Sequence, residues 1–153
     1  MIYLDNAATT KPSSSAMEKA SVYVTEEYFN PSGKYRQAVK LTADLAETRK
    51  TLLSLVGKRN GEVIFTSCGT ESDNTAVFCH VGKGKCVTTE GEHSAIDAAF
   101  EELSRRGTIT EKAKLHADGS VDVEDLLSKI DERTAFVSVI HVNNETGAIN
   151  DRS

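Results

Sequence analysis

The segment 66–72 combines the residue types that bind a phosphate group. Its sequence is Thr-Ser-Cys-Gly-Thr-Glu-Ser, and it follows the apolar, β-prone run 62–65. The residues after it have the composition of a helix, and a helix start favours an anion through its unpaired N–H groups and dipole. Gly69 would let the anion approach the backbone, and Ser67 and Thr70 offer hydroxyl donors. An ordinary N-cap at Thr70 explains the same residues, and the local sequence leaves both readings open.

The elements that would position this loop alternate along the chain. The N-terminal part predicts a loop at 5–10, a helix from about 13–15 to 28, a break at 30–33 and a longer helix at 35–56. Beyond it the pattern predicts strands at 63–66, 85–89, 108–114 and 134–140, separated by helices at 70–80, 95–105 and 123–130. This alternation is typical of βαβ units with a mainly parallel sheet.

Polar clusters follow three of the predicted strands. They are 67–70, then Glu-Gly-Glu-His at 90–93, and His-Val-Asn-Asn-Glu-Thr-Gly at 141–147. Because ligands of parallel α/β sheets bind beyond the carboxyl ends of the strands, these clusters are expected to converge on one crevice.

Composition narrows the class of protein. The chain has 153 residues and a net charge of −5, which gives no support to nucleic-acid binding. No apolar run approaches the roughly 20 residues of a membrane helix, and the N-terminus lacks the features of a secretory signal. The three cysteines are odd in number and lack metal-ligand spacing, so we expect reduced thiols, no metal and a cytoplasmic location.

Five collinear stretches carry a family resemblance. They are Tyr-Leu-Asp-Asn-Ala-Ala-Thr-Thr at 3–10, Asn-Pro-Ser at 30–32, Phe-Thr-Ser-Cys-Gly-Thr-Glu-Ser-Asp-Asn at 65–74, Glu-His at 92–93, and the cluster 141–147. Together they resemble the N-terminal part of a cysteine desulfurase of the NifS/IscS-like group, within the class V aminotransferases. These enzymes use pyridoxal 5'-phosphate (PLP) and have the type I fold of PLP enzymes.

The resemblance implies a fold and a division of the chain. We expect a three-layer α/β fold, with a mainly parallel sheet flanked by helices, like the N-terminal portion of the large domain of such enzymes. Residues 1–60 would form an N-terminal loop and helical segment, and 61–153 a partial PLP-binding domain. The sheet would be cut partway through, leaving the strand 134–140 near an exposed edge, so dimerisation or aggregation is expected.

The resemblance also implies site residues. Gly69 and Thr70 match positions that bind the PLP phosphate. His93 matches the histidine that stacks on the pyridine ring and assists proton transfer, which makes it the catalytic candidate, although a plain surface or core histidine is the alternative. Asn144 matches the asparagine that hydrogen-bonds the ring hydroxyl, with a turn as the alternative for it and its neighbour. Cys68 replaces a frequent glycine and is expected to be a small, buried or half-buried filler.

Two departures from the family pattern limit the expected activity. Tyr35 stands where the family often has a histidine, in Asn-Pro-Ser-Ser-x-His. The Schiff-base lysine, the acidic partner of the ring nitrogen and the nucleophilic cysteine lie later in family sequences than Ser153. We therefore expect this chain alone to lack desulfurase activity.

The parent enzyme would take sulfur from L-cysteine, giving L-alanine and an enzyme persulfide for iron–sulfur cluster or thio-cofactor synthesis. A sulfur-acceptor or scaffold protein and a second copy of the chain would be its partners. The alternatives are another class V enzyme (a selenocysteine lyase or an aminotransferase) and a non-catalytic truncated chain. A dinucleotide site is disfavoured, because the loop has neither Gly-x-Gly-x-x-Gly nor the Lys-Ser/Thr of a P-loop.

Overall fold

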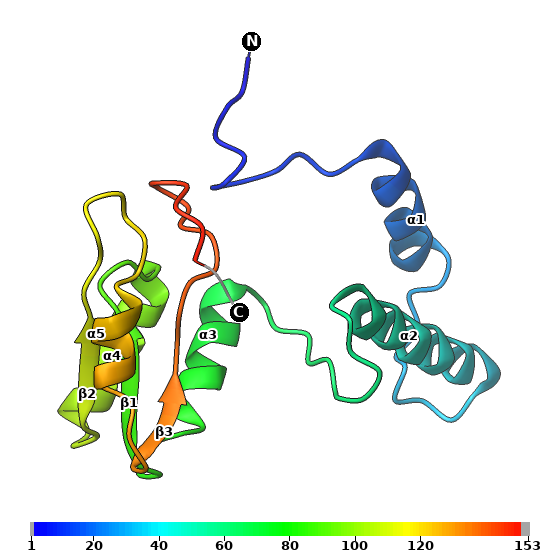
Figure 1. Ribbon diagram of the computed structural model, residues 1–153. Helices are drawn as coiled ribbons and strands as arrows, with labels where there is room; N and C mark the ends of the chain where they lie inside the picture. The colour runs from blue at the N-terminus through cyan, green and yellow to red at the C-terminus, as the bar shows by residue number, and fades with distance from the viewer. Residues whose placement is uncertain (1, 151–153) are drawn as a thin grey trace. The chain divides into compact units, whose positions relative to one another are not determined.

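The computed structural model describes residues 2–150. The chain forms two compact units, Met1–Phe65 and Thr66–Ser153, which are described separately below (Figure 1). The division into an N-terminal segment 1–60 and a PLP-binding part 61–153 stays a prediction.

The first unit contains the two helices that the sequence predicts. Helix α1 spans Ser14–Thr25, and the hydroxyl of Ser13 caps it by accepting the N–H of Ala16 at 3.2 Å. Helix α2 spans Arg36–Leu55, and its inner face buries Ala38 and Leu41. Helix α1 ends at Thr25, before the predicted end at about residue 28, and the predicted turn at Asn30-Pro31 lies between the two helices.

The predicted strand at 63–66 is wrong, because these residues form no ladder. The strand-like composition is present, but 63–66 has no partner strand in residues 2–150, and a strand needs a partner for its N–H and C=O groups. The segment lies against α2 instead, where Arg49 donates from Nε to the carbonyl of Val63 at 3.1 Å. The guanidinium also lies 5.2 Å from the ring centroid of Phe65, while Ile64 is 72% exposed.

The second unit is built around a three-stranded parallel sheet in the order β2-β1-β3. The strands are β1 (Lys85–Thr89), β2 (Thr110–Ala113) and β3 (Thr134–Val137). The helices are α3 (Gly69–Phe78), α4 (Ser94–Arg105) and α5 (Val123–Ser128). The central strand β1 is buried along its whole length, as expected for a strand covered on both faces.

Helices flank this sheet as right-handed crossovers require. Strands β2 and β3 lie on opposite sides of β1, so the crossovers through α4 and α5 lie on opposite faces (Figure 1). The main core joins α3, β1 and α4, and consists of Val77, Cys86, Ile96, Ala99, Phe100 and Leu103. The predicted fold class, an α/β fold with a mainly parallel sheet flanked by helices, is confirmed.

Strand β3 is shorter than the predicted 134–140. The N–H of Ser138 still bonds to the carbonyl of Val87 at 3.0 Å. The N–H of Ile140 instead donates to the carboxyl Oε1 of Glu92 at 2.6 Å. A side chain has thus taken the donor that a continued ladder would need, and the strand ends at Val137.

Candidate functional site

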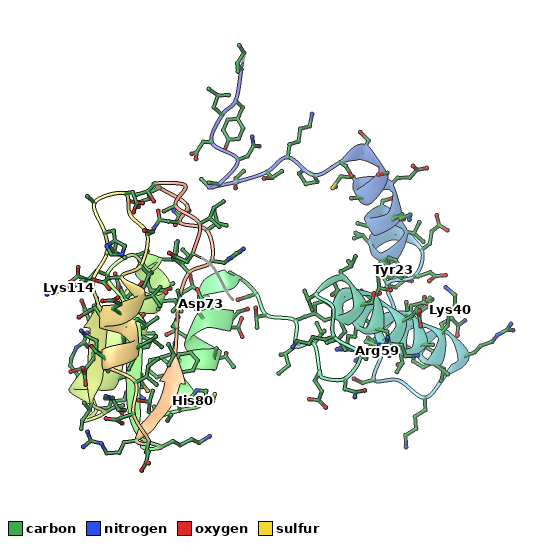
Figure 2. The ribbon with its side chains drawn as sticks, in the orientation of Figure 1. Tyr23, Lys40, Arg59, Asp73, His80 and Lys114 are labelled. Carbon is green, nitrogen blue, oxygen red and sulfur yellow. The ribbon has the colours of Figure 1, made fainter. Side chains whose placement is uncertain are left out.

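The predicted site residues all belong to the second unit, at the carboxyl end of its sheet. Helix α3 precedes β1 and runs back along the sheet, so its first residues lie at this end. Figure 2 labels Asp73 in the first turns of α3 and His80 just beyond its last turn, and β3 points towards the Asp73 end. The helix start and the loops after β1 and β3 therefore share one end of the sheet, where ligands of such folds bind.

The start of α3 is open to an anion. Its N-cap residue, Cys68, makes no side-chain capping hydrogen bond. A Cβ added at Gly69 would meet no atom within 4 Å, so there is free space beside this backbone. Thr70 is exposed, and its hydroxyl makes no hydrogen bond within residues 2–150. These are the features that a phosphate at a helix N-terminus requires.

Ser67 does not offer the free hydroxyl donor that its sequence position predicts. Its Oγ donates to Oε2 of Glu71 at 2.6 Å, and its backbone N–H donates to the same oxygen at 2.7 Å. The Ser67 hydroxyl and N–H hold the pKa of Glu71 below its usual range. Thr70 thus remains the free hydroxyl of this loop.

The expectation that Cys68 is a buried filler is wrong, because its side chain is exposed. As the N-cap it precedes the helix rather than facing the core. The backbone N–H of Glu71 and the hydroxyl of Ser67 hold the pKa of the Cys68 thiol below its usual value, as expected for a thiol at a helix start.

His93 is the N-cap of α4. Its Nδ1 accepts the backbone N–H of Ala95 at 3.2 Å. A ring nitrogen that accepts carries no proton, so the neutral ring that keeps this cap has its proton on Nε2. His93 is exposed, so this Nε2–H is available for a ligand.

The two neighbouring asparagines differ in their contacts. Asn143 donates from Nδ2 to the carbonyl of Gly91 at 2.9 Å, and its Oδ1 accepts the N–H groups of Glu145 and Thr146 at 2.8 Å each. Asn143 therefore builds the turn. The Asn144 side chain is exposed and makes no hydrogen bond within the described chain, so its amide is available to a ligand.

His93 and Asn144 line one pocket of about 300 Å³. Its other lining residues come from the loop after β1, the segment after β3 and the loop after β2: Glu90, Gly91, Glu92, Ser94, Leu115, Asn143, Glu145 and Thr146. Gly69 and Thr70 do not line this pocket, although they lie at the same end of the sheet. The structure thus brings His93 and Asn144 together in one pocket and leaves Gly69 and Thr70 outside it.

A larger pocket of about 710 Å³ contains none of the predicted site residues. Its lining is mostly aliphatic, from Val121, Val123, Leu126, Val139, Ile140 and Ile149, together with His116, Ser120, His141 and Asn150. The ring of His141 contacts the carbonyl of Asn150 at 3.0 Å. The predicted site residues His93 and Asn144 line the smaller pocket, so the smaller pocket is the better candidate site.

The sequence alone predicts no separate role for Glu92. Its carboxyl group is half-buried against the segment that follows β3, and burial raises the pKa of Glu92. Its partner, Ile140, lies 48 positions away. The only sequence signal was its place beside His93 in the matching Glu-His pair, which says nothing about a partner so distant.

Neither a metal-ion site nor a membrane-spanning helix is found in the described part of the chain. Within residues 2–150, no three His, Cys, Asp or Glu side chains are grouped to hold a metal ion. No helix in the same range has the length and apolar character needed to cross a bilayer.

The residues present fit the phosphate and ring-hydroxyl parts of PLP. The open space beside Gly69 leaves room for a phosphate oxygen, and the Thr70 hydroxyl is free to donate. The unpaired amide of Asn144 can donate to a phenolate-like oxygen, which an ionised carboxylate could not do.

Comparison with known proteins agrees with this fold. The cysteine desulfurase of Nostoc sp. strain PCC 7120 is 33% identical over 97% of this chain and 38% of its own length. A NifS/IcsS protein homolog of Lactobacillus delbrueckii subsp. bulgaricus is 37% identical over 97% of this chain and 40% of its own length. The chain therefore spans about two fifths of the curated relatives it matches.

Solved structures give the same result. A NifS-like protein superimposes with a TM-score of 0.91 at 30% identity, covering 97% of this chain and 42% of its own. A structure of SspA in complex with cysteine gives 0.89 at 25% identity, covering 97% and 44%. The sequence profile of the class-V aminotransferases matches residues 2–153. On this match, and with the parallel sheet and helix-start loop described above, the chain belongs to the class-V aminotransferase family and corresponds to the N-terminal part of its NifS-like members.

Proposed function

We propose that this chain is the cofactor-binding N-terminal part of a PLP-dependent cysteine desulfurase. The observation that carries the proposal is the pocket shared by His93 and Asn144, at the end of the sheet where the open start of α3 lies. A planar ring with a hydroxyl on one side and a phosphate on the other requires hydrogen-bond donors at both places, here the Asn144 amide and the start of α3. The cysteine desulfurases among the relatives support the assignment.

Each residue has a role that its surroundings allow. The N–H of Gly69 and the hydroxyl of Thr70 bind the phosphate, and the dipole of α3 favours its negative charge. His93 packs on the ring and moves a proton through Nε2, while its Nδ1 stays fixed by the N–H of Ala95. Asn144 donates to the ring oxygen. PLP, when bound, acts as the electron sink of the reaction.

The parent enzyme takes sulfur from L-cysteine. The C–S bond of the substrate breaks, its sulfur joins an enzyme thiol as a persulfide, and L-alanine leaves. The solved complex of SspA with cysteine supports this substrate. The parent enzyme forms a homodimer and passes the sulfur to a sulfur-acceptor or scaffold protein. The sulfur is then used in iron–sulfur cluster or thio-cofactor synthesis. The free thiols of all three cysteines support a cytoplasmic location.

The 153-residue chain by itself is expected not to turn over L-cysteine. None of its lysines follows a histidine, so the Ser/Thr-x-His-Lys context of the anchoring lysine does not occur in it. Formation of alanine from L-cysteine by the purified chain with PLP would contradict this part of the proposal. Release of selenide from selenocysteine by the parent, without turnover of cysteine, would assign the parent to the lyases instead.

The binding half of the proposal is tested with pyridoxine 5'-phosphate. This analogue keeps the phosphate and the ring hydroxyl but has no aldehyde, so it cannot react with surface lysines. In equilibrium binding, Thr70→Ala and Asn144→Ala are each expected to weaken its affinity about tenfold, the worth of one hydrogen bond to a charged group.

Thr75→Ala is the matched control for Thr70→Ala. Thr75 is an exposed threonine of the same helix, and its hydroxyl already donates to the carbonyl of Glu71 at 2.7 Å. Its replacement is expected to leave the affinity unchanged. Equal affinity in all variants, or no binding by the unsubstituted chain, would contradict the proposal.

A further inference from the structure

Hydrogen bonds tie the loop after β1 to the segment after β3. The carboxyl Oε1 of Glu92 accepts the N–H of Ile140 at 2.6 Å. The amide of Asn143 donates to the carbonyl of Gly91 at 2.9 Å. The first loop carries His93 and the second segment carries Asn144, so these bonds join the two sides of the candidate pocket.

Glu92 occupies an unfavourable place for a carboxyl group. It is half-buried and forms no ion pair within residues 2–150. Asp73 on α3 and Asp97 on α4 lie close enough to disfavour its charge, and Asp97 is itself paired with Lys112 at 2.7 Å. Burial is the largest cause that raises the pKa of Glu92, and hydrogen bonds from the N–H of Ile140 and the side chain of Ser138 oppose it. A desolvated acid kept near two other acids is typical of a functional position.

The N–H of Ile140, which donates to Glu92, makes no hydrogen bond to a strand of the sheet within residues 2–150. The last bond between β3 and β1 is from the N–H of Ser138 to Val87, and Ile140 lies two residues further on. Without Glu92, the half-buried N–H of Ile140 would lose the only hydrogen bond that it makes within residues 2–150, which is costly for a backbone donor. The segment 138–144 would then shift to find water.

We propose that Glu92 is a positioning residue, whose carboxyl group holds Ile140 and thereby fixes the distance across the pocket between His93 and Asn144. The inference rests on the proposed function of this pocket, because it assigns Glu92 a part in holding the same ligand. The bond from Asn143 to Gly91 holds the turn near the loop but does not fix the chain at Ile140.

The direct test is a pH titration of backbone amide resonances by NMR. In the unsubstituted chain, the Ile140 amide is expected to shift with a midpoint above the ordinary glutamate pKa of about 4.3, because its acceptor titrates there. Glu92→Gln keeps a carbonyl acceptor and is expected to abolish that titration while leaving Asn144 and His93 resonances in place. Glu92→Ala is expected to move the resonances of both Asn144 and His93.

Glu90→Ala is the matched control. Glu90 lines the same pocket from the same loop, is exposed, and makes no side-chain hydrogen bond within the described chain. Its replacement removes one negative charge but should leave the Ile140 titration unchanged. An Ile140 amide that titrates equally in the chain with Glu92→Gln, or Asn144 and His93 resonances unmoved by Glu92→Ala, would overturn the proposal.

Affinity for pyridoxine 5'-phosphate separates positioning from stability. At equal thermal stability, Glu92→Ala is expected to weaken binding at least about tenfold, and Glu92→Gln to restore it to within about threefold. Binding equal in both variants would overturn the positioning role. If the unsubstituted chain does not bind, the proposed function fails, and the Ile140 titration still decides whether Glu92 holds the loop. If Glu92→Ala does not fold, the titration of the Ile140 amide in the chain with Glu92→Gln decides whether Glu92 holds Ile140.

Discussion

The neighbouring residues Asn143 and Asn144 are expected to respond in opposite ways to replacement by alanine. Asn143→Ala removes three hydrogen bonds, to Gly91, Glu145 and Thr146. Each hydrogen bond contributes about 0.5–1.5 kcal/mol. Because water can reach the freed groups of this surface turn, we expect a loss of about 2 kcal/mol, below the sum of the three. Asn144→Ala removes no hydrogen bond within residues 2–150 and should change stability by less than about 0.5 kcal/mol.

The assay must report on the second unit. The chain has no tryptophan, and its four tyrosines all lie before residue 66, so intrinsic fluorescence reports on the first unit. Cys86 on β1 is 0% exposed and becomes reactive only when the sheet opens. In a background with Cys68→Ser and Cys79→Ser, the rate at which a thiol reagent labels Cys86 measures this opening.

A loss of 2 kcal/mol corresponds to labelling of Cys86 about 30-fold faster in Asn143→Ala, when reclosing is faster than labelling. Asn144→Ala should label within about twofold of the parent rate, yet lose affinity for pyridoxine 5'-phosphate. Equal labelling rates in the two variants would refute the division into a turn-building and a ligand-binding asparagine.

Three further substitutions test other parts of the structure. Gly69→Ala should leave thermal stability unchanged, since its Cβ would meet no atom within 4 Å. It should weaken the binding of pyridoxine 5'-phosphate measured by calorimetry. Unchanged affinity would contradict the proposal that the phosphate binds beside Gly69. Thr88→Val should slow Cys86 labelling about fivefold, which corresponds to a gain in stability of about 1 kcal/mol. The reason is that the Thr88 hydroxyl is 0% exposed and lacks a partner within residues 2–150. Faster labelling would contradict this. Hydrogen bonds from Arg133 and Lys85 hold the pKa of Asp131 far below its usual range, so its stabilisation is present above the ordinary aspartate pKa and is lost as pH falls through the lowered one. Between about pH 4 and pH 2 the unsubstituted chain should therefore lose stability more steeply than Asp131→Asn in urea unfolding followed by circular dichroism; parallel profiles would contradict it.

Local pattern was enough to predict the central elements of the second unit. Strand β1 has the bounds that were expected, Lys85–Thr89, because a buried parallel strand is a continuous β-prone run. The segment 63–66 has a similar composition but no partner strand among residues 2–150, so pattern alone overpredicted it. Strand pairing depends on segments far apart in the chain, which local composition does not contain.

The candidate site, like the fold, could be predicted from the sequence only in part. The polar clusters after the strands indicated where His93 and Asn144 would lie, and the structure places both in one pocket, while their roles stay predictions. The contact of Glu92 with Ile140 and that of Asn143 with Gly91 span 48 and 52 positions. No spacing rule in the sequence connects residues so distant, and so the way the pocket is held together became visible only in the fold.

The central claim is that the start of α3 and the pocket of His93 and Asn144 bind one phosphorylated pyridine ring. Titration of the isotope-labelled chain with pyridoxine 5'-phosphate, followed by NMR, tests it most directly. We expect saturable shifts that are largest at Gly69, Thr70, His93 and Asn144, and none in residues 2–60. Absence of saturation, or shifts scattered over both units, would contradict it.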